Sequence, residues 1–298
     1  MKLITKPRII GIVLLVIGIL GYLAQKSNSI VIGIAGIILI IAPTKHTSHV
    51  LELFIDTFKR WKIIIITALY DAIYWLFVYG IIYFFKWQLQ KAAANAQATA
   101  VLSGVMTPEA AEPTANALQG FVFTIFGGAA IAFILCLLAY TLARGMIWAT
   151  IADKKPDKKL FIKMLGANAG WWAIWGILFV LIALGGKNNP NSKMALFGLL
   201  AVATYFTPIM HAIFIKTRQI GYSISNGLAW GIARVHRFII PYIFALIVFV
   251  IMYQPFRLVQ NTAYLQPASM LFVVLFFAWL KIYIYDVVTE FEEVRKIK

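Results

Sequence analysis

The sequence predicts an all-α protein, a polytopic transmembrane helical bundle, and three observations lead to this fold class. Of its 298 residues, 62% are hydrophobic and only 13% are charged, and the mean hydropathy is +0.85. Apolar runs of roughly membrane-spanning length recur to the end of the chain. Positive charges gather in every second segment between these runs. Together these observations exclude a water-soluble globular domain.

Residues 1–44 are expected to form an N-terminal transmembrane hairpin. Apolar runs at 9–24 and 30–42 follow a basic start. Both are shorter than the roughly 20 residues that a full crossing needs, so they either cross a thin membrane or re-enter it. The stretch before Gln25 and Lys26 is a poor cleavage site for a signal peptidase, which predicts an uncleaved signal anchor.

Residues 45–298 are expected to form a bundle of six further spans, which brings the predicted total to about eight. The six apolar runs cover residues 63–85, 120–143, 168–185, 195–215, 239–254 and 268–287. Of the 27 Lys and Arg residues, 20 fall in alternate connecting segments, six in the others, and Lys281 lies inside the last run. The positive-inside rule then predicts that both termini are cytoplasmic, and we expect a plasma (cytoplasmic) membrane location.

Three connecting segments are each expected to hold a cytoplasmic-side interfacial amphipathic helix just before a span. They cover residues 50–61, 156–165 and 224–235, and each sets apolar side chains at helical spacing against polar ones. In the third, the predicted apolar face comprises Ile224, Leu228, Ile232 and Val235. We expect the basic residues of these helices to contact anionic lipid headgroups; they are Lys59, Arg60, Lys62, Lys158, Lys159, Lys163, Arg234 and Arg237.

The segment at about 86–119 is a long insertion on the outer side, rich in Ala and Gln. Thr107 and Pro108 supply a helix cap followed by a first-turn proline, so we expect two helices with a break near Ser103 and Gly104. One interpretation is that these helices prolong the neighbouring spans outward. The other is that they form a docking surface for an external partner.

Asp71 is the first candidate functional residue, because it lies well inside an apolar run. At 1.5 Å per residue it is roughly 12 Å from the cytoplasmic edge, too deep for an aspartate to reach water. An unpaired charge there costs about 2.5–3.5 kcal/mol, so the carboxyl group must face the bundle interior, be protonated or pair. Thr67, Tyr74 and Trp75 share its helical face.

Lys281 is the obvious partner for Asp71, since it lies at comparable depth in the last span. It is also only about five residues from the inner end of that span, a distance that its side chain can cover by snorkelling to water. Both interpretations stay open.

The sixth span supplies the third polar element, with Thr204, Thr207 and His211 near one face and Pro208 interrupting the backbone hydrogen bonds. Such a break either lines a binding cavity or only bends the helix, with the hydroxyls satisfying backbone groups locally. His211 titrates near neutral pH in water and lies near the cytoplasmic end of the span.

Metal and enzyme chemistry are disfavoured. His46, His49, Glu52 and Asp56 do not form a closed ligand set, and the acidic pair lies near Lys59 and Arg60. We therefore expect no metal and no cofactor. No phosphate-binding glycine loop, nucleophile elbow or paired-carboxylate motif is present, and no residue-level motif of a characterised family is recognised.

Three function classes remain. The first is a non-enzymatic membrane-embedded subunit, scaffold or biogenesis factor. The second is a small-solute or ion transporter that uses Asp71. The third is a lipid-binding or lipid-handling protein whose basic helices gather anionic headgroups. The expected partners are membrane lipids and other membrane protein subunits; the positive charge follows the membrane topology, so no nucleic-acid partner is expected.

Overall fold

The computed structural model describes residues 44–102, 108–185, 192–258 and 265–296, and every regular element in these ranges is a helix. The predicted spans at 9–24 and 30–42 lie outside the described residues. The helices are α3 (Thr44–Lys59), α4 (Trp61–Leu102), α5 (Pro108–Ile151), α6 (Lys158–Gly185), α7 (Ser192–Thr217), α8 (Ile220–Ala233), α9 (Val235–Leu258) and α10 (Leu265–Lys296). The all-helical fold class is confirmed for this part of the chain.

Five of the described helices are long and apolar enough to cross a membrane: α4, α5, α6, α7 and α10. In α9 the apolar stretch is shorter and covers Ile240–Gln254. Within hydrocarbon, every backbone N–H and C=O group must find a partner inside the segment, which is why uninterrupted helices suit such sequences. The described helices therefore belong to a membrane-embedded protein.

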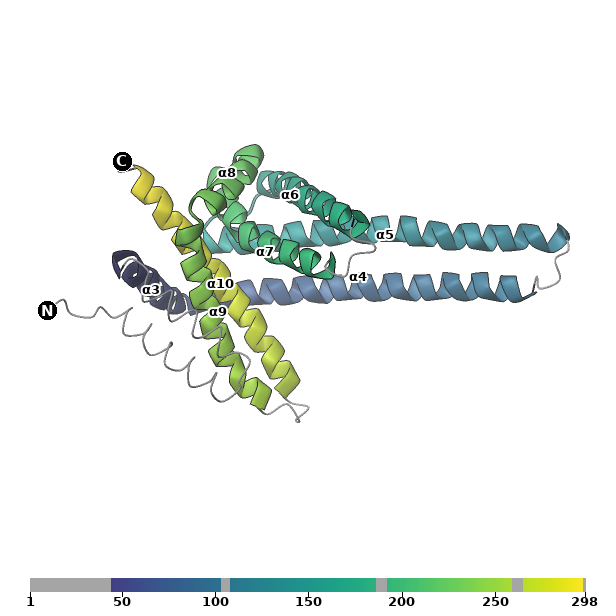
Figure 1. Ribbon diagram of the computed structural model, residues 1–298, viewed down its shortest axis with the longest axis horizontal. Helices are drawn as coiled ribbons and strands as arrows, with labels where there is room; N and C mark the ends of the chain where they lie inside the picture. The colour runs from purple at the N-terminus through teal and green to yellow at the C-terminus, as the bar shows by residue number, and fades with distance from the viewer. Residues whose placement is uncertain (1–43, 103–107, 186–191, 259–264, 297–298) are drawn as a thin grey trace.

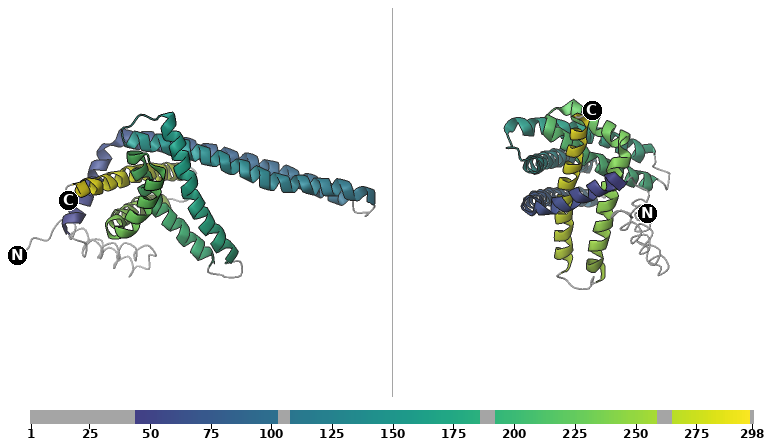
Figure 2. Two further views of the ribbon diagram at one scale, coloured as in Figure 1. Left: turned by 90° about the horizontal axis from the view of Figure 1, so that it is seen from above. Right: turned by 90° about the vertical axis from the view of Figure 1, so that its left-hand side faces the viewer.

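Three helix pairs diverge from one shared region: α4 with α5, α6 with α7, and α9 with α10 (Figure 1). The two further views show the same divergence from other directions (Figure 2). We call the shared region the hub. It comprises the start of α4, the end of α5, the start of α6, the end of α7, α8, the first half of α9, and the middle and second half of α10. The other end of each pair is its distal end.

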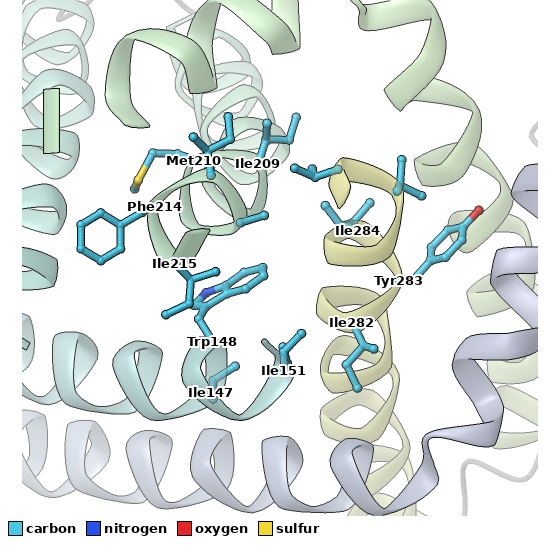
Figure 3. Packing of buried hydrophobic residues seen from close by; sticks show 14 of the residues in the cluster. Ile147, Trp148, Ile151, Ile209, Met210, Phe214, Ile215, Ile282, Tyr283 and Ile284 are labelled. Carbon is cyan, nitrogen blue, oxygen red and sulfur yellow. The ribbon is translucent and has the colours of Figure 1, made fainter. Parts of the chain in front are cut away.

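The buried core lies in the hub. Figure 3 shows α5, α7 and α10 packing there through aliphatic and aromatic side chains. Trp148 and Ile151 of α5 meet the last turns of α7 and the segment of α10 around Tyr283. Apolar helices gain little from hydrophobic transfer inside lipid, so this contact area is held mainly by close van der Waals packing and polar contacts.

In α5, α6 and α7, in contrast, the described side chains toward the distal ends are not buried. No residue of α5 from Ala115 to Tyr140 is buried. In α6 the last buried residue is Trp175, and in α7 the first is Ala203. The buried contacts that hold these three helices together therefore lie toward the hub.

The α4/α5 pair is longer than a bilayer. The two helices have 42 and 44 residues, or roughly 63 Å at 1.5 Å per residue, whereas the hydrocarbon core is roughly 30 Å thick. Residues 86–102 and 108–119 continue the two apolar helices without a break, so the described parts of the Ala- and Gln-rich insertion prolong α4 and α5.

Of the three expected amphipathic helices, the second is not a separate element. Residues 158–165 are the first two turns of α6, which runs unbroken to Gly185. Leu160 and Met164, expected to face lipid, are fully buried in the hub. The predicted boundary was wrong because the apolar pattern of this segment faces protein. The first segment corresponds to α3 and the third to α8.

In α8 the residues buried against protein are small residues and one tryptophan, not the apolar residues expected at the membrane interface. Ile232 is 67% exposed, whereas the buried residues are Ser223, Gly227, Trp230 and Gly231. A Cβ atom at Gly227 would lie 3.0 Å from Met210 Cβ, and one at Gly231 would lie 2.3 Å from the Phe206 ring. The small residues thus let α8 approach α7 closely, and this contact decides which face is buried.

Candidate functional site

Asp71 of α4, Arg144 of α5 and Lys281 of α10 form a buried ion cluster, which we call the hub cluster. Arg144 Nη1 donates to Asp71 Oδ1 at 2.8 Å, and Lys281 Nζ donates to Asp71 Oδ2. The Asp71 side chain is 5% exposed, that of Arg144 13% and that of Lys281 15%. The pairing of Asp71 with Lys281, which the sequence left open, is thus present, and the cluster joins three helices.

Arg144 is the member of the cluster that sequence reasoning missed. The predicted span ended at residue 143, which assigned Arg144 to a loop. Helix α5 instead continues to Ile151 and buries Ile147 and Trp148 beyond Arg144. The spacing of Ile147, Trp148 and Ile151 continues the apolar helical pattern and is the signal that identifies the true end.

Aromatic side chains flank the guanidinium group of Arg144. Its Cζ atom lies 5.0 Å from the ring centroid of Tyr140 and 5.8 Å from that of Tyr74, within the range of cation–π contacts. Tyr74 therefore belongs to the site, as expected, whereas Trp75 points outward and is exposed. Thr67 is fully buried one turn before Asp71, and its hydroxyl has no hydrogen-bond partner among the described residues.

A second polar group connects α5, α6 and α7 next to the hub cluster. Asn168 Nδ2 donates to Thr141 Oγ1 at 3.1 Å, so Asn168 Oδ1 accepts from His211 Nε2 at 2.8 Å. All three side chains are buried. The His211 ring also lies 6.1 Å from the ring of Tyr140, which contacts Arg144. The structure thus places His211 in a hydrogen-bonded network beside the cluster.

Thr204 and Thr207 have local roles. Thr204 is exposed and its hydroxyl donates to the Leu200 carbonyl at 2.8 Å, so it does not join the polar network. Thr207 Oγ1 donates to the Ala203 carbonyl at 2.6 Å and accepts from Trp171 Nε1 at 2.9 Å. Helix α7 continues through Pro208. Of the two interpretations that the sequence left open, these contacts match the one in which the hydroxyls satisfy backbone groups locally, and Thr204 is not grouped with His211.

Several basic side chains bond the carbonyls at helix C-termini. Arg60 Nη2 donates to the Ile151 carbonyl at 2.8 Å at the end of α5, and Lys154 Nζ donates to the Ile215 carbonyl at 2.8 Å near the end of α7. Lys163 Nζ donates to the Arg218 carbonyl at 3.1 Å. The last carbonyls of a helix lack partners within it and carry partial negative charge, so cations stabilise them.

These contacts correct part of the expected headgroup surface. Arg60 also pairs with Asp286 at 2.9 Å, Lys163 bonds a backbone carbonyl, and Arg234 lies 4.9 Å from the Trp230 ring centroid. Lys59 pairs with Asp56 at 2.6 Å but is exposed. The remaining described members are exposed and stay candidates for headgroup contact: Lys62, Lys158 and Lys159. The Arg237 side chain lies outside the described part of the structure.

Asp157 caps the first turn of α6. Its Oδ1 atom accepts from the Leu160 backbone N–H at 2.5 Å, and its Oδ2 atom accepts from Arg218 Nη1 at 2.8 Å. The backbone hydrogen bond and then the Arg218 contact lower the pKa of this carboxyl group below its ordinary value of 3.8. A carboxyl group whose pKa is lowered by folding adds stability above its unfolded pKa and loses that stability as the pH falls through the folded pKa.

Asp157→Asn is therefore expected to lower the Tm at pH 7, with the difference from the wild type shrinking below about pH 4. The reason is that a protonated carboxyl group carries no negative charge, so the two hydrogen-bond donors, the Leu160 N–H and the Arg218 guanidinium, stabilise it less. Thermal unfolding in detergent from pH 7 to pH 3 measures this. Asp153→Asn is the matched control, because Asp153 is an exposed carboxylate in the same loop and its positive φ of 51° also suits Asn. A Tm difference that does not change with pH would contradict the prediction.

Within the described ranges, no group of three or more His, Cys, Asp or Glu side chains is arranged to hold a metal ion. The side chains of His46 and His49 are not among those that the structure describes. No family model, curated protein or solved structure matches this chain significantly, so its function is inferred from the fold and the hub alone.

Proposed function

We propose that this protein is a non-enzymatic, membrane-embedded subunit or scaffold, and that its α4/α5 pair binds another integral membrane protein. The observation that carries the proposal is the absence of any buried residue in α5 from Ala115 to Tyr140. A helix pair that projects from the hub with all its outer surface uncovered offers a long binding surface. We also propose a plasma membrane location with both termini cytoplasmic, as the charge distribution predicts.

The uncovered surface of α4 and α5 is rich in aromatic side chains. Tyr79, Tyr83, Phe123 and Phe126 are all at least 64% exposed. Within lipid, helices associate through close packing rather than through transfer from water, and bulky rings supply large contact areas for it. Beyond the apolar section, the pair continues past the bilayer as an Ala- and Gln-rich extension, which reaches the part of a partner outside the membrane.

The hub cluster makes cation transport the weaker hypothesis. Both carboxylate oxygens of Asp71 already accept hydrogen bonds from Arg144 and Lys281. A transported cation would have to displace a positively charged side chain from each oxygen it binds. The cluster is instead suited to joining α4, α5 and α10 to one another at the hub, so that the distal ends keep their directions.

Photocrosslinking in native membranes tests the proposal. Benzoyl-phenylalanine at Phe126 on α5 is compared with the same group at Leu184 on α6, because both side chains are 72% exposed. We expect Phe126 to yield one discrete adduct, identified by mass spectrometry as an integral membrane protein, and Leu184 to yield only lipid adducts. Lipid adducts alone at Phe126, identical protein adducts at both positions, or an adduct with a second copy of this chain would contradict the proposal.

A further inference from the structure

The hub cluster is not charge-balanced. It holds two cationic side chains and one carboxylate, and among the described residues Asp71 is the only acid that pairs with Arg144 or Lys281. The His211 network beside it consists of groups that add no negative charge. An uncompensated charge buried in a low-dielectric interior is strongly unfavourable, so a bound anion would stabilise the charged form of both cations.

Three other negatively charged or partially negative groups in the hub already have a positively charged partner. Asp286, the next acid of α10, pairs with Arg60 at 2.9 Å. The carbonyl of Ile151, at the C-terminus of α5, also accepts from Arg60, and that of Ile215, near the end of α7, accepts from Lys154. These helix ends therefore have cations of their own, and the surplus charge at Arg144 and Lys281 needs a different counterpart.

The two cations of the cluster are slightly more exposed than its carboxylate. The side chain of Asp71 is 5% exposed, whereas those of Arg144 and Lys281 are 13% and 15% exposed. Two further groups lie next to Asp71 on α4: Tyr74 beside the guanidinium, and the fully buried Thr67 hydroxyl, which has no hydrogen-bond partner among the described residues.

We propose that the hub cluster binds an oxyanion of the phosphate class between α4, α5 and α10. The planar guanidinium and the ammonium group together match phosphate oxygens, which accept several charge-assisted hydrogen bonds. Arg144 lies seven residues before Ile151, roughly 10 Å along the axis of α5. The phosphate of a lipid headgroup and a free phosphate ion both present the oxygens that this site would bind.

Two probes distinguish these sources in full-length protein purified in uncharged, phosphate-free detergent. Inorganic phosphate is titrated against chloride at equal ionic strength, and short-chain phosphatidic acid is titrated against diacylglycerol of the same chain length. The Tm and native mass spectrometry report binding, because a ligand that binds the folded state raises the Tm saturably. A saturable rise with phosphate assigns the free ion, and a rise with phosphatidic acid alone assigns the lipid headgroup; either supports the proposal.

The matched variants are Lys281→Met, which removes the surplus cation but keeps the Asp71–Arg144 pair, and Lys193→Met, which removes an exposed cation at the distal end of α7, outside the cluster and outside the expected headgroup surface. We expect Lys281→Met to weaken binding at least tenfold and Lys193→Met to leave it unchanged. Should Lys281→Met fail to fold, Arg144→Lys keeps the charge but loses the planar donor fork, and about tenfold weaker binding is expected. No saturable binding to the wild type, or wild-type affinity in the variant that folds, would overturn the proposal.

Discussion

Asp71→Asn is expected to lower the free energy of unfolding by about 3–5 kcal/mol. The change keeps the shape of the side chain but leaves Arg144 and Lys281 buried beside each other without a carboxylate. Two adjacent cations then repel each other in a region of low dielectric constant. Unfolding in mixed micelles by increasing SDS fraction, followed by circular dichroism, measures the loss.

Lys281→Met is the informative control for this prediction. It removes the surplus cation and leaves Asp71 paired with Arg144 at 2.8 Å. Replacing a buried charge by an apolar side chain of similar length is often tolerated when the remaining charges balance. We therefore expect a loss well below that of Asp71→Asn, and an equal or greater loss would show that charge balance does not govern this cluster.

Trp148→Ala is expected to cost roughly 2–4 kcal/mol of unfolding free energy, somewhat less than such a change costs in a soluble core. Trp148 is 1% exposed and lies between α5, α7 and α10 in the hub. In lipid, most of the free energy of transfer from water to an apolar interior disappears. The cost of the cavity and of the lost van der Waals contacts remains. The same SDS titration measures the effect.

Trp75→Ala tests whether burial is the cause of that loss. Trp75 is 58% exposed on α4, so its indole ring touches few protein atoms. Its removal is expected to cost less than about 1 kcal/mol, because surface substitutions leave packing intact. Equal losses for the two tryptophans would contradict the placement of Trp148 in a packed hub.

The sequence was sufficient to predict the long apolar helices and to single out Asp71. Apolar runs of membrane length identify α4 to α7 and α10, because in hydrocarbon the backbone groups must form hydrogen bonds within the helix, whatever the side-chain contacts are. The depth of Asp71 in its run similarly indicates that its charge needs a partner, whereas pairing and snorkelling were both open for Lys281. Both features follow from local composition, which is why they can be read without a structure.

The features that the sequence did not predict depend on contacts between helices. Arg144 was assigned to a loop because an arginine normally marks the end of an apolar run, yet α5 buries another two turns beyond it. Asn168, at the start of a predicted span, gave no signal of its partner His211. The divergence of the three pairs was equally unpredictable, because helices that are apolar on every side do not reveal which face meets protein.

An exchange of charge between positions 71 and 281 tests most directly whether α4 and α10 are joined through the hub cluster. Asp71→Lys alone places three cations together and is expected to abolish folded protein in membranes. Adding Lys281→Asp restores one carboxylate beside two cations, and at least half of the folded yield is expected to return. If the double variant folds no better than Asp71→Lys alone, Asp71 and Lys281 do not form the contact on which the hub depends.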